Sequence, residues 1–343
     1  MRPALITRES PDLRAVSEII GVTMLLAMVI SVMAGVVLVM QPFLEDLTDN
    51  RKWVAGSVAA TQFNDRVLIA ADAPEGSGIV VLSSQLANSI APLGSAETWV
   101  VSADLVGNDR VVVLSYAGTI NVTSLNGTPA SVEITTAIAN ESWTISGSGE
   151  HEVNISLSDW FRIEVRDSSG EVIHRQIQTV LDGMRLSTPL KDGPFNIDLI
   201  NGARVEQLPN QPLVVKAYPR LGFDEMLDGK SRVSLVLLDI ETSSSIDSAL
   251  NRIEITSQGQ ISFFDDSARN LRIEMTFPGE STREPRYLHH WNENFELNRV
   301  TDTLDDFVGF GPYGRLSGSE GMTMHPTDAS IHLDVVMQQV VVT

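Results

Sequence analysis

A long apolar run stands near the start of the sequence. From Ile19 to Met40, the residues IIGVTMLLAMVISVMAGVVLVM follow one another for 22 positions without a charge. At about 1.5 Å per residue, a helix of this length spans roughly 30 Å of hydrocarbon. The run is longer than the apolar core of a secretory signal peptide, and no small-residue cleavage site follows it. The pattern predicts a transmembrane helix.

A second helical pattern covers residues 41–73. Pro42 can kink or restart the helix, and Pro74 marks the place where it is expected to end. Between these prolines, apolar residues recur three, four or seven positions apart, in a series made of Leu47, Val54, Val58, Ala59, Phe63, Val67 and Ala70. This spacing predicts an amphipathic helix that continues toward the following domain and packs its apolar face on it.

Beyond Gly76 the hydrophobic period changes to two. The clearest runs are Phe161, Ile163 and Val165, which alternate with Arg162, Glu164 and Arg166, and Leu271, Ile273, Met275 and Phe277, which alternate with Arg272, Glu274 and Thr276. Such alternation predicts strands with one buried and one solvated face. Turn signals separate the runs, at Ala117-Gly118, Asp167 to Gly170 and Gln258-Gly259.

The predicted fold class is α+β, with a long N-terminal hydrophobic helix followed by a large antiparallel β-sandwich-like domain over residues 74–343. Gly-Pro and Asn-Gly signals between Lys191 and Ala203 offer a division of this domain into two lobes near residue 185. The last residues, from Ala329 to Thr343, alternate as a strand. Such a terminal strand is expected to be tied into a sheet.

The net charge of the chain restricts the classes of molecule that it can bind. There are 24 Lys and Arg residues against 44 Asp and Glu residues, a net charge of -20. A field of this sign repels the phosphates of nucleic acid, which we exclude as a partner. The chain has no cysteine, so it forms no disulfide, thiol nucleophile or thiolate metal site.

The leader before the apolar run indicates the orientation in the membrane. It holds three arginines (Arg2, Arg8 and Arg14) against two acidic residues, a net charge of +1. Cytoplasmic flanks of transmembrane helices are enriched in basic residues. We therefore expect a single-pass protein of the cell membrane with its N-terminus in the cytoplasm and the β-rich domain outside, as an ectodomain.

The stretch from Arg14 to Met28, RAVSEIIGVTMLLAM, resembles the start of archaeal type IV pilins and flagellin-like surface proteins. The resemblance covers roughly the first 40 residues. It implies cleavage by a prepilin-type peptidase between Ala15 and Val16. Residues 1–15 would then be a cytoplasmic leader, and residues 16–40 a transmembrane and assembly helix.

Glu18 departs from this family pattern. Many members carry proline at its position, and bacterial pilins place a helix glutamate at the fifth mature residue, whereas Glu18 would be the third. We therefore interpret Glu18 as a favourable charge at a helix N-terminus near the membrane interface.

Small residues recur along one side of the apolar run. Ala27, Ser31 and Gly35 stand four positions apart, a spacing that permits close packing of helices in a membrane or in a filament core. The expected partners are the lipid bilayer, the prepilin-type peptidase and other pilin-like subunits.

Four Asn-x-Ser/Thr triplets lie within one short region, and each is a candidate glycan acceptor on an exported protein. The acceptors are Asn121, Asn126, Asn140 and Asn154. Pro129 directly follows the triplet of Asn126, which counts against glycosylation there. Asn154 lies in an expected strand, but its side chain points outward and is accessible.

The sequence holds no motif of an enzyme. His289, His290 and Glu293 lack the spacing of a zinc helix, and the carboxylates at Asp265-Asp266 and from Asp302 to Asp306 follow no calcium-loop template. The glycine-rich stretch from Gly309 to Gly321 lacks the Gly-Lys-Ser/Thr of a phosphate-binding loop, and we interpret it as a surface loop. Neither a nucleophile elbow nor a His-Glu-x-x-His motif occurs. We expect no catalysis, cofactor or metal.

Two hypotheses for function stay open. In the first, the chain is a pilin-like surface protein, processed before Val16, that serves as a minor subunit of a type IV pilus-like filament. In the second, it is a single-pass binding or adhesion protein that never polymerises.

Overall fold

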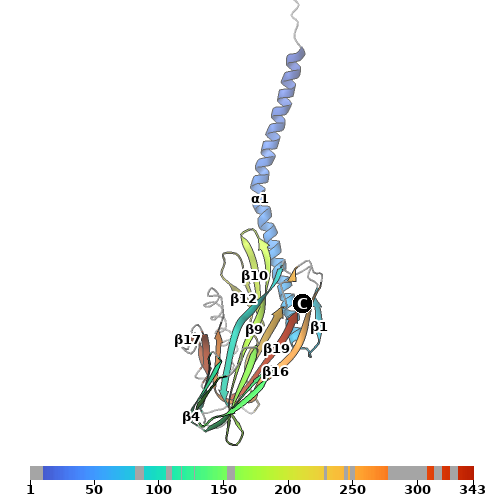
Figure 1. Cartoon of the computed structure of the whole chain (residues 1–343). Coiled ribbons are helices and arrows are strands. Elements are labelled where there is room, and N and C mark those ends of the chain that lie inside the picture. The colour runs from blue at the N-terminus through green and yellow to red at the C-terminus, as the bar shows by residue number, and fades with distance from the viewer. Residues whose placement is uncertain are drawn as a thin grey trace, which may run out of the picture. The chain divides into compact units, whose positions relative to one another are not determined.

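The computed structural model describes residues 11–81, 89–105, 110–116, 118–126, 128–152, 159–227, 230–242, 246–247, 252–276, 307–312, 319–324 and 331–343. The chain divides into two compact units, Met1–Val54 and Ala55–Thr343. The first contains most of helix α1 (Pro11–Ala71), and the second contains the end of this helix and every described strand (Figure 1).

Helix α1 is continuous over 61 residues and contains Pro42. A proline lacks the backbone N–H that would bond to the carbonyl four residues earlier, here that of Leu38. The helix nevertheless does not restart at Pro42. It ends at Ala71, three residues before Pro74. The predicted end near residue 73 is therefore close to the observed one.

In its described residues, unit Ala55–Thr343 contains a sheet of 16 strands and a sheet of three. The large sheet consists of β1 (Gly78–Val81), β2 (Ser89–Asp104), β5 (Pro129–Thr136), β6 (Asn140–Thr144), β8 (Trp160–Asp167), β9 (Val172–Leu190), β10 (Gly193–Ile200), β11 (Ala203–Gln207), β12 (Val214–Ala217), β13 (Leu221–Glu225), β14 (Ser231–Thr242), β15 (Ile246–Asp247), β16 (Ile253–Thr276), β17 (Phe307–Pro312), β18 (Ser319–Met324) and β19 (Ile331–Val342). The small sheet consists of β3 (Arg110–Tyr116), β4 (Thr119–Asn126) and β7 (Gly149–Glu152).

The main path of the large sheet runs β12-β11-β10-β9-β2-β16-β19-β14-β13. Its described pairs are antiparallel, as predicted, apart from the parallel pair β14 and β19. Strand β16 joins the two halves of the path, because its first part pairs with β19 and its last part pairs with β2. The predicted α+β class is therefore confirmed.

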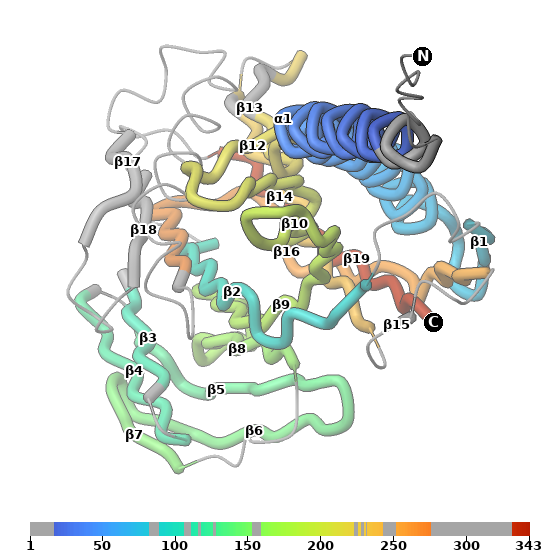
Figure 2. The backbone as a smooth tube through the Cα atoms, turned by 90° about the horizontal axis from the view of Figure 1, so that it is seen from above, coloured from blue at the N-terminus to red at the C-terminus, as the bar shows by residue number. Residues whose placement is uncertain are grey.

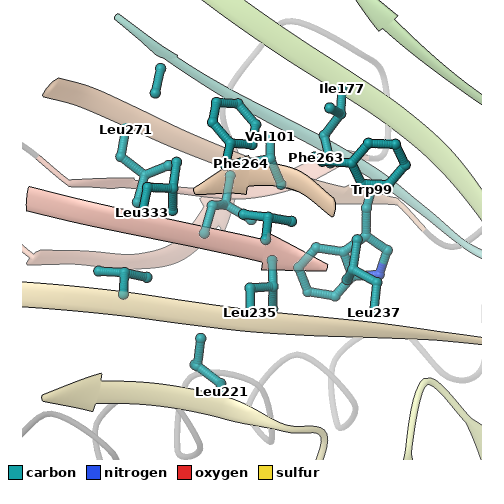
Figure 3. Close-up of a cluster of buried hydrophobic side chains, with 14 of the residues drawn as sticks. Trp99, Val101, Ile177, Leu221, Leu235, Leu237, Phe263, Phe264, Leu271 and Leu333 are labelled. Carbon is teal, nitrogen blue, oxygen red and sulfur yellow. The ribbon is translucent and has the colours of Figure 1, made fainter. Parts of the chain in front are cut away.

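The main core lies where the sheet folds over on itself. Trp99 and Val101 of β2 meet Phe263 of β16 and Leu235 and Leu237 of β14, and all of these side chains are buried (Figure 3). A second cluster forms between β5, β8 and the small sheet, with Val132, Ile163, Val165, Ile120 and Val122 among its members. The alternation predicted for residues 161–165 and 271–275 faces these two cores.

Two predicted boundaries fall inside continuous strands. Gln258-Gly259 is not a hairpin turn but a bulge within β16, where the pairing to β19 shifts register between Ser257 and Gly259. Gly259 adopts a φ of 92°, which a glycine reaches at little steric cost. Residue 185 lies within β9, which pairs on both sides there, so the expected boundary between two lobes does not fall at this place. The turn at residues 167–170 lies where predicted, between β8 and β9. Residue 117 lies outside the described residues, and Gly118 directly precedes β4, which pairs with β3.

The predicted solvated faces contain buried carboxylates. Glu164 and Glu274 are buried, and each has an arginine beside it. The Glu164 carboxylate accepts hydrogen bonds from Arg166 at 2.6 Å and from Arg175 at 2.9 Å. Arg175 also donates to Asp266 Oδ2 at 2.6 Å, and this aspartate lies within β16. Alternation therefore identified the strands but not the burial of their charged side.

Asp239 of β14 is a buried carboxylate of another kind. Its Oδ1 accepts a hydrogen bond from the backbone N–H of Asp182 at 2.8 Å, and its Oδ2 accepts one from Gln339 Nε2 at 3.2 Å. Burial raises the pKa of Asp239 to about 6, and the neighbouring carboxylates of Asp182 and Asp159 add to this effect.

We expect Asp239→Asn to change how the free energy of unfolding depends on pH. An aspartate of the unfolded chain titrates near pH 3.9, so the folded domain binds an extra proton between about pH 4 and pH 6. The wild-type domain therefore gains stability as the pH falls through 6, and the variant loses this dependence. At pH 8 the variant should be more stable by about 1–3 kcal/mol, and at pH 4 the two should be equal.

Urea unfolding of the detergent-solubilised chain, followed by the fluorescence of the buried Trp99 among the tryptophans, measures this difference. Asp192→Asn, at an exposed turn, is the matched control and should leave the pH dependence unchanged. Equal stability of Asp239→Asn and wild type at pH 8 would contradict the prediction.

Candidate membrane anchor and helix-docking site

The first part of α1 presents an apolar surface on all sides. Every large apolar side chain from Ile19 to Met40 is between 45% and 71% exposed within the chain. The helix is long and apolar enough to cross a membrane, by length and composition. Charged residues resume after Met40, at Glu45, Asp46 and Asp49. The apolar surface therefore has a defined length, close to that of a bilayer core.

The two polar side chains within this segment are satisfied by the helix itself. Thr23 Oγ1 donates to the carbonyls of Ile19 and Ile20, both at 2.9 Å. Ser31 Oγ donates to the carbonyl of Ala27 at 2.8 Å. A hydroxyl that donates to the preceding turn leaves no N–H or O–H seeking a partner in hydrocarbon. The segment can therefore lie in lipid without an unpaired donor.

The residues of the predicted assembly stripe lie within this exposed segment. Ala27, Ser31 and Gly35 belong to α1, and a Cβ added at Gly35 would meet no atom within 4 Å. Glu18 is exposed in the same helix. Arg14, Ala15 and Val16 are helical, while their side chains lie outside the described part.

The last part of α1, from Ala55, packs on the sheet of its own unit. Ala60, Phe63 and Val67 are fully buried, and Ala70 completes the same stripe. At Gly56 the helix lies against β9 and β10, since a Cβ added there would be in ordinary van der Waals contact with Phe195 Cε1 and Thr188 Oγ1, both at 3.5 Å. The spacing of three and four along residues 56–70 therefore places the apolar side chains on the one face of the helix that packs on the sheet.

Polar contacts border this docked face. Ser57 Oγ donates to Glu206 Oε1 at 2.7 Å, and Arg204 of the same strand donates to Thr61 Oγ1. At the end of the helix, the Asp72 carboxylate accepts hydrogen bonds from Arg220 at 2.7 Å and from Gln338 at 3.0 Å. Partial burial raises the pKa of Asp72, but these two bonds outweigh it and hold the pKa below its ordinary value.

The predicted apolar face is confirmed from Ala59 to Ala70 and is wrong at Val58. This residue is 53% exposed, although it fits the helical spacing, because the docked stripe runs along Ala59, Ala60 and Phe63. Leu47 and Val54, in the other unit, are exposed as well. Sequence reasoning did not identify Arg204, Glu206 or Arg220 as docking partners. No signal in the sequence pairs them with helix residues that lie 143 to 149 positions earlier.

The candidate glycan acceptors differ in their surroundings. Asn140 is exposed at the start of β6, and Asn121 is half-buried in β4, which has a paired strand on each side. The side chain of Asn126 and all of Asn154 lie outside the described residues, as do His289, His290, Glu293 and Asp302 to Asp306. In the described ranges, no group of three metal-ligating residues occurs. Part of the expected loop from Gly309 to Gly321 forms β17 and β18 instead.

The alternating strand predicted at the end of the chain is confirmed from Ile331 onward as β19. Ile331, Leu333 and Val335 are buried on one face of this strand. His332 lies on the other face, with its Nε2 3.2 Å from Asp265 Oδ1.

We expect Phe63→Ala to lower the free energy of unfolding of the β-rich unit by about 3–5 kcal/mol. The fully buried ring lies in the middle of the docked face, and its removal leaves a cavity. Ile69→Ala, in the same helix at a side chain that is 53% exposed, is the matched control and should change stability by about 0.5 kcal/mol or less. Urea unfolding of the full chain in detergent measures both. Equal losses would contradict docking of this face.

Comparison with known proteins gives no match, either to a protein-family model, to a curated protein or to a solved structure. The resemblance to archaeal type IV pilin-like proteins therefore rests on residues Arg14 to Met28. The exposed apolar part of the helix and its docked end are structural observations that do not depend on this resemblance.

Proposed function

We propose that the protein is a pilin-like surface protein, held in the cell membrane by α1 and carrying its β-rich unit outside the cell. The observation that supports this most directly is the division of α1 into two surfaces. From Ile19 to Met40 the helix is apolar and exposed, and from Ala59 to Ala70 it has one buried face on a folded unit. One continuous helix thus serves as both anchor and domain element.

The chemistry of each part suits that role. The segment from Ile19 to Met40 contains no charge, and its two hydroxyls are bonded within the helix. The β-rich unit carries the acidic excess of the chain, which keeps a surface domain soluble. Arg14 stands on the side of the apolar segment where the positive-inside rule places the cytoplasm.

The small residues along the anchor support assembly. With Ala27, Ser31 and Gly35 on one side, two such helices can approach more closely than helices with large residues there. The proposed role is a minor subunit of a type IV pilus-like filament, in which this helix packs among those of other subunits.

We expect the mature chain, purified from its native membranes, to begin at Val16. In the family that the sequence resembles, a small residue stands directly before the cut, the position that Ala15 holds here. Ala15→Trp should therefore retain the leader, while Ala4→Trp, elsewhere in the leader, should be processed normally. Mass spectrometry of the intact chain measures the N-terminus. A wild-type chain that begins at Met1 would overturn the pilin-like assignment and leave an anchored surface protein.

Processing alone does not separate a filament subunit from a processed monomer. Shearing of intact cells followed by detection of the chain in the filament fraction makes this distinction. A chain found only in the membrane fraction would favour the single-pass binding or adhesion protein.

We expect a cysteine placed in the β-rich unit to react with a membrane-impermeant maleimide on intact cells. The natural chain has no cysteine, so one introduced thiol is a unique probe. Ser168→Cys lies in the exposed turn between β8 and β9, and Arg8→Cys lies in the leader. Labelling of Ser168→Cys before lysis, and of Arg8→Cys only after lysis, is the expected result. The reverse pattern would mean an inverted orientation.

A further inference from the structure

Of the four Asn-x-Ser/Thr triplets, one has both its asparagine and its hydroxyl residue exposed in the described structure. Asn140, Glu141 and Ser142 are all exposed, and they form the start of β6. Among described strands, β6 pairs with β5 alone, so its other edge carries no strand. Figure 2 shows β6 on the outer side of β5. Within the described residues, no strand blocks the approach of a glycosyltransferase to this edge.

The pleat of β6 places the acceptor and the hydroxyl on the same side. Residues two apart in a strand point to the same face, so Asn140 and Ser142 share one face and Trp143 points to the other. Trp143 packs against the cluster that contains Val132 and Ile134. Its ring stacks on His151 of β7 at a centroid distance of 4.3 Å. The face of Asn140 and Ser142 is therefore directed away from the small sheet.

The turn before Asn140 holds the acceptor in this position. Thr136 N–H and Thr136 Oγ1 both donate to the carbonyl of Ala139, at 2.8 and 3.1 Å. The backbone N–H of Ala139 in turn donates to Thr136 Oγ1 at 2.9 Å. Asn140 thus directly follows a tight, hydrogen-bonded turn at the exposed end of the β5–β6 hairpin.

The contact of the acceptor amide is compatible with a glycan. Asn140 Nδ2 donates to Glu133 Oε1 at 2.8 Å, across the β5–β6 pair. A glycosylated asparagine is a secondary amide and keeps one N–H, so it can still donate to this carboxylate. Glu133 also accepts a hydrogen bond from Arg166 Nη2 at 3.0 Å, so its charge stays partnered in either state.

Asn121 is the instructive contrast. It lies in the middle strand of the small sheet, opposite Leu114 of β3 and Glu150 of β7, and it is half-buried. Its Oδ1 accepts a hydrogen bond from the hydroxyl of Thr123 in its own triplet, at 3.3 Å. A glycan at this place would project from the face of the sheet between the side chains of Leu114 and Glu150.

We propose that Asn140 is a site of N-linked glycosylation, an inference that rests on the exterior location of the β-rich unit proposed above. The donor is an oligosaccharide joined through its first carbon to a polyprenyl phosphate, and a membrane transferase uses it outside the cytoplasm. The bond from that carbon to the phosphate oxygen breaks, and a bond to Asn140 Nδ2 forms. The amide gives up one proton to a base of the transferase, and polyprenyl phosphate leaves.

The test is peptide mass spectrometry of the full chain purified from its native membranes, with the variants Asn140→Gln, Ser142→Ala, Ser142→Thr and Asn121→Gln. We expect a saccharide mass on the peptide that contains Asn140. Asn140→Gln and Ser142→Ala should abolish this mass, whereas Ser142→Thr, which keeps the hydroxyl, and Asn121→Gln should retain it. A peptide that carries Asn140 without any saccharide in the wild-type chain would overturn the proposal.

The labelling of Ser168→Cys keeps this result separate from the proposed function. If that thiol reacts on intact cells and Asn140 is unmodified, the glycan proposal fails while the surface location stands. If the thiol is protected, the exterior location itself fails. A circular dichroism spectrum equal to that of wild type excludes misfolding of Asn140→Gln as the reason for a lost glycan.

Discussion

An apolar helix surface cannot remain in water, and this constraint governs the rest of the molecule. Each large side chain between Ile19 and Met40 gains about 1.5–3 kcal/mol on leaving water, so covering the segment is worth roughly tens of kcal/mol. Lipid or other apolar helices can supply that cover, and within the chain itself these side chains stay exposed. From Ala59 onward the sheet supplies the cover instead. The cover that the helix needs therefore differs along its length. Its hydrophobic pattern differs in the same way, apolar on all sides from Ile19 to Met40 and apolar on one face from Ala59 to Ala70.

Local patterns predicted what depends on local chemistry. The apolar run, the docked stripe through Phe63 and Val67, and the alternation around Ile163 and Ile273 follow from periods of 3.6 and 2 that a single element imposes. Pairing between distant strands does not follow from such periods. The Gln258-Gly259 signal is compatible with a hairpin turn and with a bulge, and only the 12-residue partner β19 decides between them.

Buried charge was the main feature hidden from the sequence. Glu164 reads as solvated, because strand periodicity says which face a residue occupies and not what covers that face. Its burial depends on Arg166 and on Arg175, which comes from the next strand. The Asn201-Gly202 turn shows the same limit. The turn itself is evident in the sequence, yet Asn201 is fully buried and donates to the Glu97 carboxylate at 3.0 Å. For the segment from Ile19 to Met40, by contrast, length and composition alone identify a helix that could cross a membrane.

The place of β19 in the sheet has a consequence for the order of synthesis and folding. This strand, residues 331–342, lies between β14 and β16, and it contributes Leu333, Val335 and Met337 to the main core. The central sheet therefore cannot close until those residues have emerged from the ribosome, long after α1 has been made. Contacts between such distant parts of a chain form slowly. With the orientation proposed above, the helix would enter the bilayer first, and the tethered chain would cross the membrane unfolded and close its sheet last, outside the cell.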